Sequence, residues 1–592
     1  MSEPRRNKFE WLVVVIFIIV SFALRSRARL MPRAGDDWAQ QQMIEGDWCV
    51  RRGPLSLYDF GGRTVADRRA LMDSGAWPWW SHPQLSLVMF RPMSSVLLHL
   101  DVLIAGHHTT FAHIHSLCWW ALALLAVYCW LRIVFPLRIA LFALALLCVE
   151  ESATVPVVWI ANRNALVAMT FSGFGLAALA SARNRGSTRL AMLCALLLFA
   201  ALMASEYALC FFGYAVATEF GPRGNLALRR SHSILAWAVP FGVWVLLYRY
   251  YGAGVSGSSV YIDPITDPTR FARVLPARIA LLLRHLITTF PITDPNPLRV
   301  GPTLVPTLPI LLGLIFCVWI ASQSYDSNLR HTIVRLSCGT LFSLFPAVGS
   351  FTSARLALAG SIGVAVAFAI VLDGLVVTLS SRPQTKLKVV QLTILIPATV
   401  LIIVFHLVYA TRSVLTETEN WIQTYTNNER GLSHSQLNLR EIRNGTVILI
   451  AAADMQTLLY APSVLAAHGI PHLCAWRVLS VHPGPVLLRR TDAFTLDVVL
   501  LGSEWLTSSA ETLFRSTDQP LSVGQRITVR DMTATVMKMG RLGPLQMRFV
   551  FNRSLDDRSI QLVWSSAHGL RRIPRLTVGR TVVVPAAQMP SR

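Results

Sequence analysis

Charged residues are scarce in this chain of 592 residues. Asp, Glu, Lys and Arg together make up 15% of it, whereas 53% is hydrophobic and the mean hydropathy is +0.49. An average soluble domain carries about 25% charged residues. Burial in a water-soluble core does not explain this composition, and we predict that lipid is the solvent for most of the chain.

Acidic residues and lysine are the rarest of the charges. Four of the 54 basic residues are lysines, and the 32 Asp and Glu leave a formal charge of +22. In a soluble protein this excess would suggest nucleic acid, but here the basic residues lie largely in short loops between apolar runs. We interpret them as topology determinants and as contacts for anionic membrane lipids. We predict no nucleic-acid partner, and the arginine bias suggests a bacterial source.

Long apolar runs dominate the first 410 residues. They show no period-2 alternation and are long enough to cross a bilayer, so we expect about eleven membrane-spanning helices. The first run follows Arg5, Arg6 and Lys8 without a small-residue cleavage site, so we expect a retained helix with a cytoplasmic N-terminus. The runs are residues 11–24, 114–135, 138–158, 163–182, 190–204, 206–220, 233–251, 303–322, 332–350, 355–378 and 389–410.

The two short runs on either side of Glu206 decide the topology. Treated as two helices, they place five basic loops on the N-terminal side, in agreement with the positive-inside rule. These loops contain Arg132/Arg138, Arg183/Arg185/Arg189, Arg223/Arg229/Arg230, Arg330/Arg335 and Arg382/Lys386/Lys388. The cluster Arg25, Arg27, Arg29 and Arg33 violates the rule. Eleven spans, an odd number, place the C-terminus outside the cytoplasm, and we expect a bacterial inner membrane.

The predicted fold is mainly α, with a membrane domain over residues 1–410 and a soluble α/β-to-β domain over 411–592. The membrane domain contains a first outer loop, 25–112, and a second, 252–301. Within the second loop, residues 270–290 have an apolar stripe and an opposite face with Arg273, Arg278, Arg284 and His285, so we expect an interfacial helix. The soluble domain has a predicted helix near 455–468 and strands at TVILIAA, FTLDVVLL, RITVRD, MRFVFN and RTVVVP.

The acidic pair Asp36-Asp37 follows the first helix directly. A carboxylate at this position could act as a general base that removes a proton from an acceptor hydroxyl. Two adjacent acids are also common in a solvated loop or at a helix N-cap. Taken alone, the pair favours the second interpretation.

Other ionisable residues are expected at the same outer face. Such residues are costly at membrane depth and are therefore functional candidates. Arginine binds phosphate in a bidentate manner and histidine transfers protons, so the set suits a phosphate-bearing lipid substrate. The set comprises Arg91, His107, His108, His113, His115, Glu150, Glu151, Arg163, Glu206 and Arg355.

The order of these motifs resembles that of the membrane glycosyltransferase superfamily of the C-type fold, in particular the transmembrane O-mannosyltransferases and their bacterial relatives. The resemblance covers about residues 10–410. It rests on Asp36-Asp37, on FRPMSSVLLHLDVLIAGHHTTFAHIHS with Arg91, Pro92, Gly106 and His113, on VVWIANRNALVAM with Trp159, Ile160 and Arg163, on Ser205-Glu206, and on a late SAR element ending in Arg355.

The resemblance implies a sugar transfer from a polyprenyl-phosphate-linked donor to an extracytoplasmic protein or glycan. Asp37 or Asp36 would be the base, and Arg91, Arg163 and Arg355 would contact the phosphate or support the structure. We add His113, Glu151 and Glu206 as substrate-binding candidates. The chain departs from the family at Glu150-Glu151, at Thr154-Val155 and in having Ser-Glu where Lys-Glu is usual. No tetratricopeptide repeats follow, and 411–592 matches no family that we recognise.

The remaining motifs favour structural roles. Trp77-Pro78-Trp79-Trp80 could stack on sugars, but we favour an interfacial anchor for the loop. Gly106-His107-His108 lacks a carboxylate or cysteine at ligand spacing, so no cofactor or metal is predicted, although a divalent ion remains compatible with the chemistry. Cys49 and Cys474 could form a disulfide, but two unpaired thiols are the favoured interpretation.

Two other functions remain open. A transporter or flippase for a lipid-linked substrate would use the same charges along a path, and it predicts broken helices near mid-membrane and paired halves. A non-catalytic scaffold would use the soluble domain to bind envelope partners.

Overall fold

The computed structural model describes residues 3–220, 230–292, 300–380, 386–437, 445–469 and 475–589. The chain forms two compact units. The helical unit comprises Met1–Met31, Phe90–Tyr251 and Pro264–Trp421, and the loop–sheet unit comprises Pro32–Met89, Gly252–Asp263 and Ile422–Arg592. In this division, parts of both outer loops are grouped with the C-terminal region, and the boundary at residue 410 stays a prediction.

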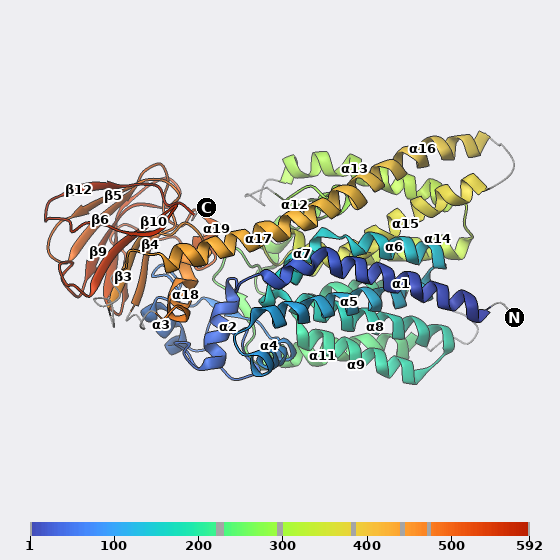
Figure 1. Cartoon of the computed structure of the whole chain (residues 1–592), viewed down its shortest axis with the longest axis horizontal. Helices are drawn as coiled ribbons and strands as arrows, with labels where there is room; N and C mark the ends of the chain where they lie inside the picture. The colour runs from blue at the N-terminus through green and yellow to red at the C-terminus, as the bar shows by residue number, and fades with distance from the viewer. Residues whose placement is uncertain are drawn as a thin grey trace. The chain divides into compact units, whose positions relative to one another are not determined.

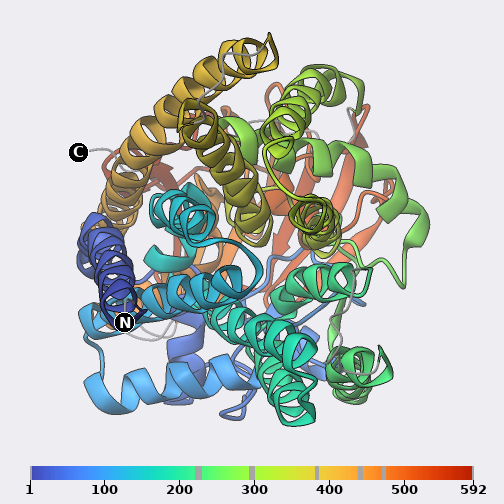
Figure 2. The same ribbon diagram turned by 90° about the vertical axis from the view of Figure 1, so that its right-hand side faces the viewer.

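The helical unit is a bundle of long apolar helices. In Figure 1 α1, α5 and α8 run side by side, and Figure 2 shows the bundle from one end. The helices are α1 (Glu3–Arg25), α4 (Pro92–Ala105), α5 (Thr109–Val134), α6 (Leu137–Cys148), α7 (Thr154–Val158), α8 (Asn164–Arg185), α9 (Thr188–Ala204), α10 (Leu209–Thr218), α11 (Arg230–Tyr250), α12 (Pro268–Thr288), α13 (Val300–Ser322), α14 (Ser327–Ala347), α15 (Leu358–Ser380), α16 (Lys386–Ile402) and the first half of α17 (Ala410–Ser433).

Several of these helices are long and apolar enough to cross a membrane. Among the described residues there are seven, or eight if a bent pair counts as one span. They are Lys8–Leu30, Thr109–Val134, Ile160–Arg185, Arg230–Tyr250, Leu304–Ser322, Ala354–Ser380, Lys388–Ser433 and the pair Leu137–Cys148 with Glu151–Val158. The predicted multi-pass helical membrane protein is confirmed, while the count of eleven spans stays a prediction.

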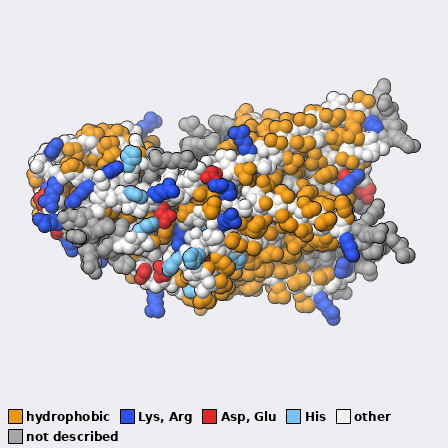
Figure 3. Space-filling view, in the orientation of Figure 1, with side chains coloured by type: hydrophobic (Ala, Val, Ile, Leu, Met, Phe, Trp, Pro, Cys, Tyr) orange, Lys and Arg blue, Asp and Glu red, His pale blue; other side chains and the backbone are white. Residues whose placement is uncertain are grey.

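The outside of the helical unit is apolar. Ile19, Leu196, Leu246 and Val305 come from four different helices and are each 60% exposed or more. Figure 3 shows hydrophobic side chains covering most of one face of these helices. Such a surface would be unfavourable in water and is stable when lipid acyl chains cover it.

The predicted span 138–158 is broken in the structure. Helices α6 and α7 meet at a bend of 54°. Arg25, one of the arginines that violate the positive-inside rule, is fully buried here and donates hydrogen bonds of 2.7 Å to the carbonyl oxygens of Cys148 and Glu150. These bonds satisfy carbonyls that the break removes from the helical pattern, so Arg25 stabilises the bend.

Helix α12 matches the predicted amphipathic segment, with one correction. Val274, Leu282 and Leu286 are buried as expected. Arg278 and His285 were expected on the polar face, but both are buried. Arg278 donates to the carbonyl oxygens of Val348 at 2.6 Å and Ser350 at 2.7 Å, and these bonds offset the cost of burying its charge.

The loop–sheet unit is built on two sheets. One has the order β11-β10-β3-β4, and β3 (Thr446–Ala451) is parallel to both neighbours, β10 (Ile560–Ser566) and β4 (Ala475–Ser480). Both β3 and β4 are buried along their whole length, as is usual for parallel strands covered on both faces. A π-helical turn, Gln456–Tyr460, and α18 (Ala461–Ala467) connect β3 to β4, close to the predicted helix. The antiparallel partner of β10 is β11 (Gly569–Arg572).

The second sheet is antiparallel, with the order β12-β5-β6-β9-β8-β7. Its strands are β5 (Val486–Arg490), β6 (Thr495–Leu500), β7 (Arg526–Val529), β8 (Met532–Met539), β9 (Pro544–Phe551) and β12 (Thr581–Val584). All five strands predicted from the sequence are present as β3, β6, β7, β9 and β12. A two-stranded ribbon pairs β1 (Ser86–Val88) with β2 (Gly254–Ser256), and the remaining helices of this unit are α2 (Asp36–Glu45), α3 (Val65–Ser74) and the short α19 (Ser509–Thr512).

The tryptophan patch is a core element and not a surface anchor. Trp77, Trp79 and Trp80 are 3%, 2% and 0% exposed. Trp79 Nε1 donates to the carbonyl oxygen of Leu479 at 3.3 Å, and its ring lies edge-on to Phe549 at 5.4 Å. The predicted anchor is therefore wrong, because these rings fill the space between the first outer loop and the C-terminal sheets.

Candidate functional site

The acidic pair opens helix α2 in the loop–sheet unit. Asp36 and Asp37 occupy the first turn, where the backbone N–H groups and the helix dipole favour a carboxylate. Gly35 precedes them with φ 51° and ψ −118°, a conformation that side-chain-bearing residues avoid. Asp37 is 6% exposed, and its Oδ2 accepts a hydrogen bond of 3.0 Å from the Ala34 N–H, whereas Asp36 is half-buried.

Two residues of the C-terminal region form hydrogen bonds with the turn that contains Gly35 and Asp36. The Tyr460 hydroxyl donates a hydrogen bond to Oδ1 of Asp36, and Oε1 of Gln456 accepts one of 3.3 Å from the Gly35 N–H. Burial and the nearby Asp36 carboxylate raise the pKa of Tyr460 well above its ordinary value. The phenol therefore stays protonated and remains a donor to Asp36.

A cation lies beside the pair. The Arg33 guanidinium lies 5.6 Å from the centre of the Trp38 ring. Burial lowers the pKa of Arg33, and the carboxylates of Asp37, Glu45 and Glu429 oppose this shift. The acidic turn is thus fixed by the first loop, by the turn after β3 and by α17.

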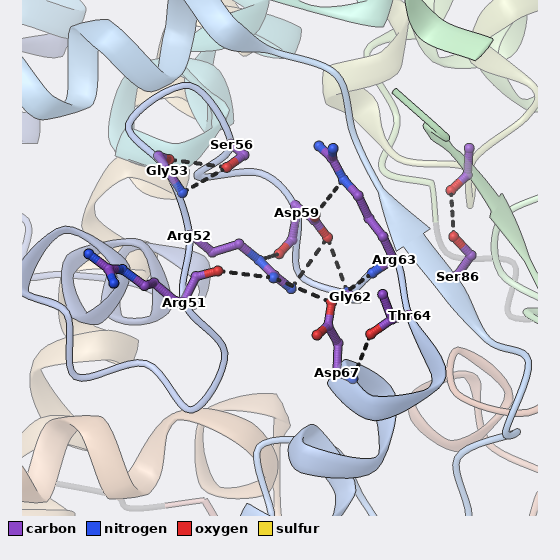
Figure 4. Close-up of polar contacts among 11 residues, drawn as sticks. Arg51, Arg52, Gly53, Ser56, Asp59, Gly62, Arg63, Thr64, Asp67 and Ser86 are labelled. Carbon is purple, nitrogen blue, oxygen red and sulfur yellow. Dashed lines mark hydrogen bonds and ion pairs between the residues drawn. The ribbon is translucent and has the colours of Figure 1, made fainter. Parts of the chain in front are cut away.

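A network of charges orders the rest of the first loop. Figure 4 shows Asp59 between Arg52 and Arg63. Arg52 Nε donates to the Asp59 carbonyl oxygen at 2.7 Å, Arg63 Nε lies 3.1 Å from Asp59 Oδ2, and Thr64 caps α3 by accepting the Asp67 N–H at 3.1 Å. The Arg52 and Asp59 side chains are 6% and 3% exposed, which identifies the network as part of the folded loop.

In the helical unit, two of the predicted residues form an ion pair. Arg91 Nε lies 2.6 Å from Oε2 of Glu206, and the other oxygen of Glu206 accepts the Phe90 N–H at 2.6 Å. Glu206 opens the 3-10 turn that follows the break at Ser205, so the predicted interruption between the two apolar runs is present. The structure brings these two residues together as partners of each other.

Arg163 also has a carboxylate partner, Asp101. Arg163 is 2% exposed and forms an ion pair with Asp101, and its Nη1 lies 2.7 Å from His115 Nδ1. His115 Nδ1 also lies 2.6 Å from Asp101. Asp101 is not among the residues predicted from the sequence, although an acid within the apolar run of α4 is a recognisable signal.

The three remaining substrate-binding candidates, His113, Glu151 and Arg355, lie elsewhere in the helical unit. His113 is fully buried in α5. Glu151 follows the break between α6 and α7 and interacts with His285, Glu417 and Ser413. The Arg355 guanidinium lies 5.1 Å from the centre of the Trp159 ring and 5.5 Å from that of Phe351, in cation–π geometry.

A small cavity lies next to the broken helix. Glu150 and His406 are its ionisable lining residues, and Phe368 packs 4.3 Å from the His406 ring. His406 Nε2 also lies 2.8 Å from the Ile287 carbonyl oxygen. Apolar side chains form most of the remaining wall.

The described residues define neither a metal site nor a disulfide. Among the described residues, no three His, Cys, Asp or Glu side chains lie together as a metal site would require. Cys49 is a free cysteine, and Cys474 lies outside the described residues, so their pairing stays open.

Comparisons with known proteins identify structural likenesses only. No family model and no curated protein matches the chain. Among solved structures, the archaeal oligosaccharyltransferase AglB of Archaeoglobus fulgidus, in complex with an inhibitory peptide and a dolichol-phosphate, is similar over 81% of this chain, with 13% identity and a TM-score of 0.46. The chain spans 65% of the length of that protein.

Two other solved structures are similar. ArnT of Cupriavidus metallidurans bound to undecaprenyl phosphate matches 80% of this chain and 90% of its own, with 11% identity and a TM-score of 0.38. The arabinofuranosyltransferase AftD from Mycobacteria matches 93% of this chain and 40% of its own, with 14% identity and a TM-score of 0.35. All three TM-scores lie below 0.5.

Proposed function

We propose that this chain is a membrane glycosyltransferase that moves a sugar from a polyprenyl-phosphate-linked donor to an extracytoplasmic acceptor. The observation that carries the proposal is the acidic turn before α2, where Tyr460 and Gln456 hold the Asp36-Asp37 segment in one conformation. A general base must stand in a defined position relative to its substrate, and side chains locked by supporting hydrogen bonds provide one.

Asp36 is the proposed base. Asp37 is buried and accepts a backbone N–H, which assigns it to holding the turn, whereas Asp36 is more accessible. The Asp36 carboxylate would take the proton of an acceptor hydroxyl as the oxygen attacks the anomeric carbon of the sugar. The bond from that carbon to the phosphate oxygen breaks, the polyprenyl phosphate leaves with the electron pair, and the anomeric configuration inverts.

Arg355 is the proposed contact for the donor phosphate. Arg91 and Arg163 each have a carboxylate partner, Glu206 and Asp101, so we assign these two to structural ion pairs. Arg355 is held over the rings of Trp159 and Phe351. A guanidinium can stack on aromatic rings through its faces, and arginine binds phosphate groups in a bidentate manner.

The same proposal includes the orientation of the chain. We place the loop–sheet unit outside the cytoplasm of a bacterial inner membrane, where acceptor proteins or glycans are found. A phosphatase reporter fused after Arg592, active only outside the cytoplasm, should be active. A cytoplasmic reporter that is active at the same position would contradict this orientation.

One observation favours the transporter alternative. The pair α6 and α7 is bent by 54° beside the cavity that Glu150 and His406 line, and transporters use broken helices of this kind. A transporter would move a lipid-linked sugar across vesicles without cleaving it. A glycosyltransferase would release polyprenyl phosphate.

The test uses purified full-length protein with a panel of synthetic polyprenyl-phosphate hexoses and an extract of bacterial envelope as acceptor. We expect time-dependent release of polyprenyl phosphate with at least one donor, together with a glycosylated product seen by mass spectrometry. Flipping of intact donor in vesicles, with no release for any donor, would favour the transporter and would contradict the proposal.

A further inference from the structure

The first outer loop and the C-terminal region form one folded unit. Arg515, in the C-terminal region, donates from Nε to the carbonyl oxygen of Trp80 at 2.8 Å. The N–H of His82 donates to the carbonyl oxygen of Phe514, also at 2.8 Å. In the second outer loop, the Ser259 N–H donates to a carbonyl oxygen of α19 at 2.8 Å. The loop with the acidic pair is thus part of the same fold as the C-terminal sheets.

One segment of this fold reaches the acidic turn directly. The π-helical turn Gln456–Tyr460 follows β3, whose six residues are all buried, so the turn starts from a fixed point. Asp454 stabilises its start, since Oδ1 accepts the Thr457 N–H at 2.7 Å and Oδ2 accepts from Asn428 Nδ2 at 2.7 Å. Tyr460, at the end of the turn, then donates to Asp36.

We propose that Tyr460 is a positioning residue for Asp36, and that the C-terminal region therefore belongs to the catalytic machinery of this chain. The inference rests on the proposed function, in which Asp36 is the base. Tyr460 would hold Oδ1 of the Asp36 carboxylate through its hydroxyl. Gln456 would fix the backbone of the same turn by accepting the Gly35 N–H.

The hydrogen bond has a predictable effect on proton transfer. A donor to a carboxylate stabilises the ionised form and lowers its pKa, so loss of the donor raises the pKa of Asp36. The other titratable or charged groups of this turn remain in place in such a variant. They are Arg33, Asp37 and Glu45 in the first loop, Tyr261 in the second, and Tyr425 and Glu429 in α17.

The experiment compares Tyr460→Phe with wild type in the full-length protein, using the donor that supports release of polyprenyl phosphate. Because the base must be ionised, the acidic limb of the profile of kcat against pH should move up by about one pH unit in the variant. The KM for the donor should change less than about twofold, since Tyr460 is not assigned to donor binding. Tyr58→Phe makes the same chemical change elsewhere in the first loop and should keep the wild-type profile.

Two further variants complete the test. Tyr460→Gln keeps a side-chain hydrogen-bond donor. The acidic limb of its profile of kcat against pH should therefore lie between those of wild type and Tyr460→Phe. Gln456→Leu should lower kcat without moving the acidic limb of the profile, because Gln456 accepts its hydrogen bond from the backbone N–H of Gly35.

The outcomes separate this inference from the proposed function. A Tyr460→Phe profile that superimposes on wild type, while Asp36→Asn is inactive, would overturn the role of Tyr460 and leave the proposed function intact. Full activity of Asp36→Asn would overturn both. Failure of both Tyr460 variants to fold would also overturn the inference, because it would make Tyr460 a residue needed for folding.

Discussion

Arg477 Nη1 donates a hydrogen bond of 2.7 Å to the carbonyl oxygen of Met72, 405 residues earlier in the chain. The same guanidinium donates to the Asp73 carbonyl oxygen at 2.6 Å and pairs through Nε with Asp531 at 2.6 Å. Its side chain is 2% exposed. A residue of strand β4 therefore satisfies the C-terminal carbonyls of helix α3 and joins the first outer loop to the sheets.

Replacing this arginine should destabilise the loop–sheet unit. Arg477→Met would remove the hydrogen bonds that Arg477 donates to Asp531 and to the carbonyl oxygens of Met72 and Asp73, at a cost of about 3 kcal/mol. We expect a lower midpoint of unfolding in tryptophan fluorescence and faster proteolysis within residues 32–89. Arg526→Met, at an exposed position on β7, is the control and should change the midpoint little. Equal midpoints for the two variants would contradict the role of Arg477.

Two glycines offer a matched test of the close approach between α3 and β4. Gly46 and Gly75 end the helices α2 and α3 with φ of 84° and 86°. A Cβ at Gly75 would lie 2.0 Å from the Trp476 carbonyl oxygen, whereas a Cβ at Gly46 would meet nothing within 4 Å.

Alanine at either position carries the strain of a left-handed conformation, about 1 kcal/mol. Only Gly75→Ala must also move backbone, so its unfolding midpoint should fall further than that of Gly46→Ala. Chemical unfolding of both variants in detergent measures the difference. Similar losses would show that α3 does not pack tightly on β4.

The ion pair of Arg91 and Glu206 should stabilise the helical unit. Both side chains are about one-fifth exposed, and Glu206 also accepts the Phe90 N–H. In a double-mutant cycle with Arg91→Gln and Glu206→Gln we expect a coupling energy of about 1 kcal/mol in thermal unfolding. The contrary result has two parts: the effects of the two substitutions on stability are additive, and only Arg91→Gln loses binding of the donor. It would support the substrate-binding role of Arg91 that was predicted from the sequence.

Arg355 should govern retention of a lipid phosphate. Arg355→Gln should weaken binding of undecaprenyl phosphate by about tenfold or more, because a charge-assisted contact is lost. Native mass spectrometry of the detergent-purified protein would measure the bound fraction. Arg189→Gln, an exposed arginine at the start of α9, is the control. Unchanged binding in Arg355→Gln would remove Arg355 from the proposed site.

The buried Glu511 predicts a dependence of stability on pH. It closes a capping box with Ser508, and burial raises the pKa of its carboxyl above the ordinary value. The folded state thus holds the proton more tightly than the unfolded state, and stability falls as pH rises from the unfolded pKa, about 4.3, through the folded pKa. Glu511→Gln, which retains the capping contacts, should reduce this loss in unfolding experiments between pH 4 and 7. An unchanged slope would contradict it.

Much of the architecture could be predicted from local sequence patterns. Apolar runs in a nearly uncharged background predict helices in lipid, and alternating or continuous β-branched runs predicted β3, β6 and β12. Span number is harder, because short runs such as 190–204 fall near the length limit, and a run such as 138–158 can bend where a side chain like Arg25 replaces the helical hydrogen bonds.

The candidate site was predictable in its residue types but not in its partners. Asp36 was identified as part of an acidic pair after the first helix, and Arg91 and Arg163 as ionisable residues expected at the outer face. Their partners Tyr460, Glu206 and Asp101 are set by tertiary contacts, the first over 424 residues. The tryptophan patch shows the same limit, since a local pattern does not tell an interfacial ring from a core ring whose partner is Leu479.

The most direct test is the rate at which Asp36→Asn releases polyprenyl phosphate from a synthetic donor, relative to wild type at pH 7. If Asp36 is the base of a glycosyl transfer, the variant should lose at least about 100-fold in kcat while it keeps its unfolding midpoint. Asp37→Asn should lose less, because its amide oxygen can still accept the Ala34 N–H. Turnover by Asp36→Asn within twofold of wild type would contradict the assignment.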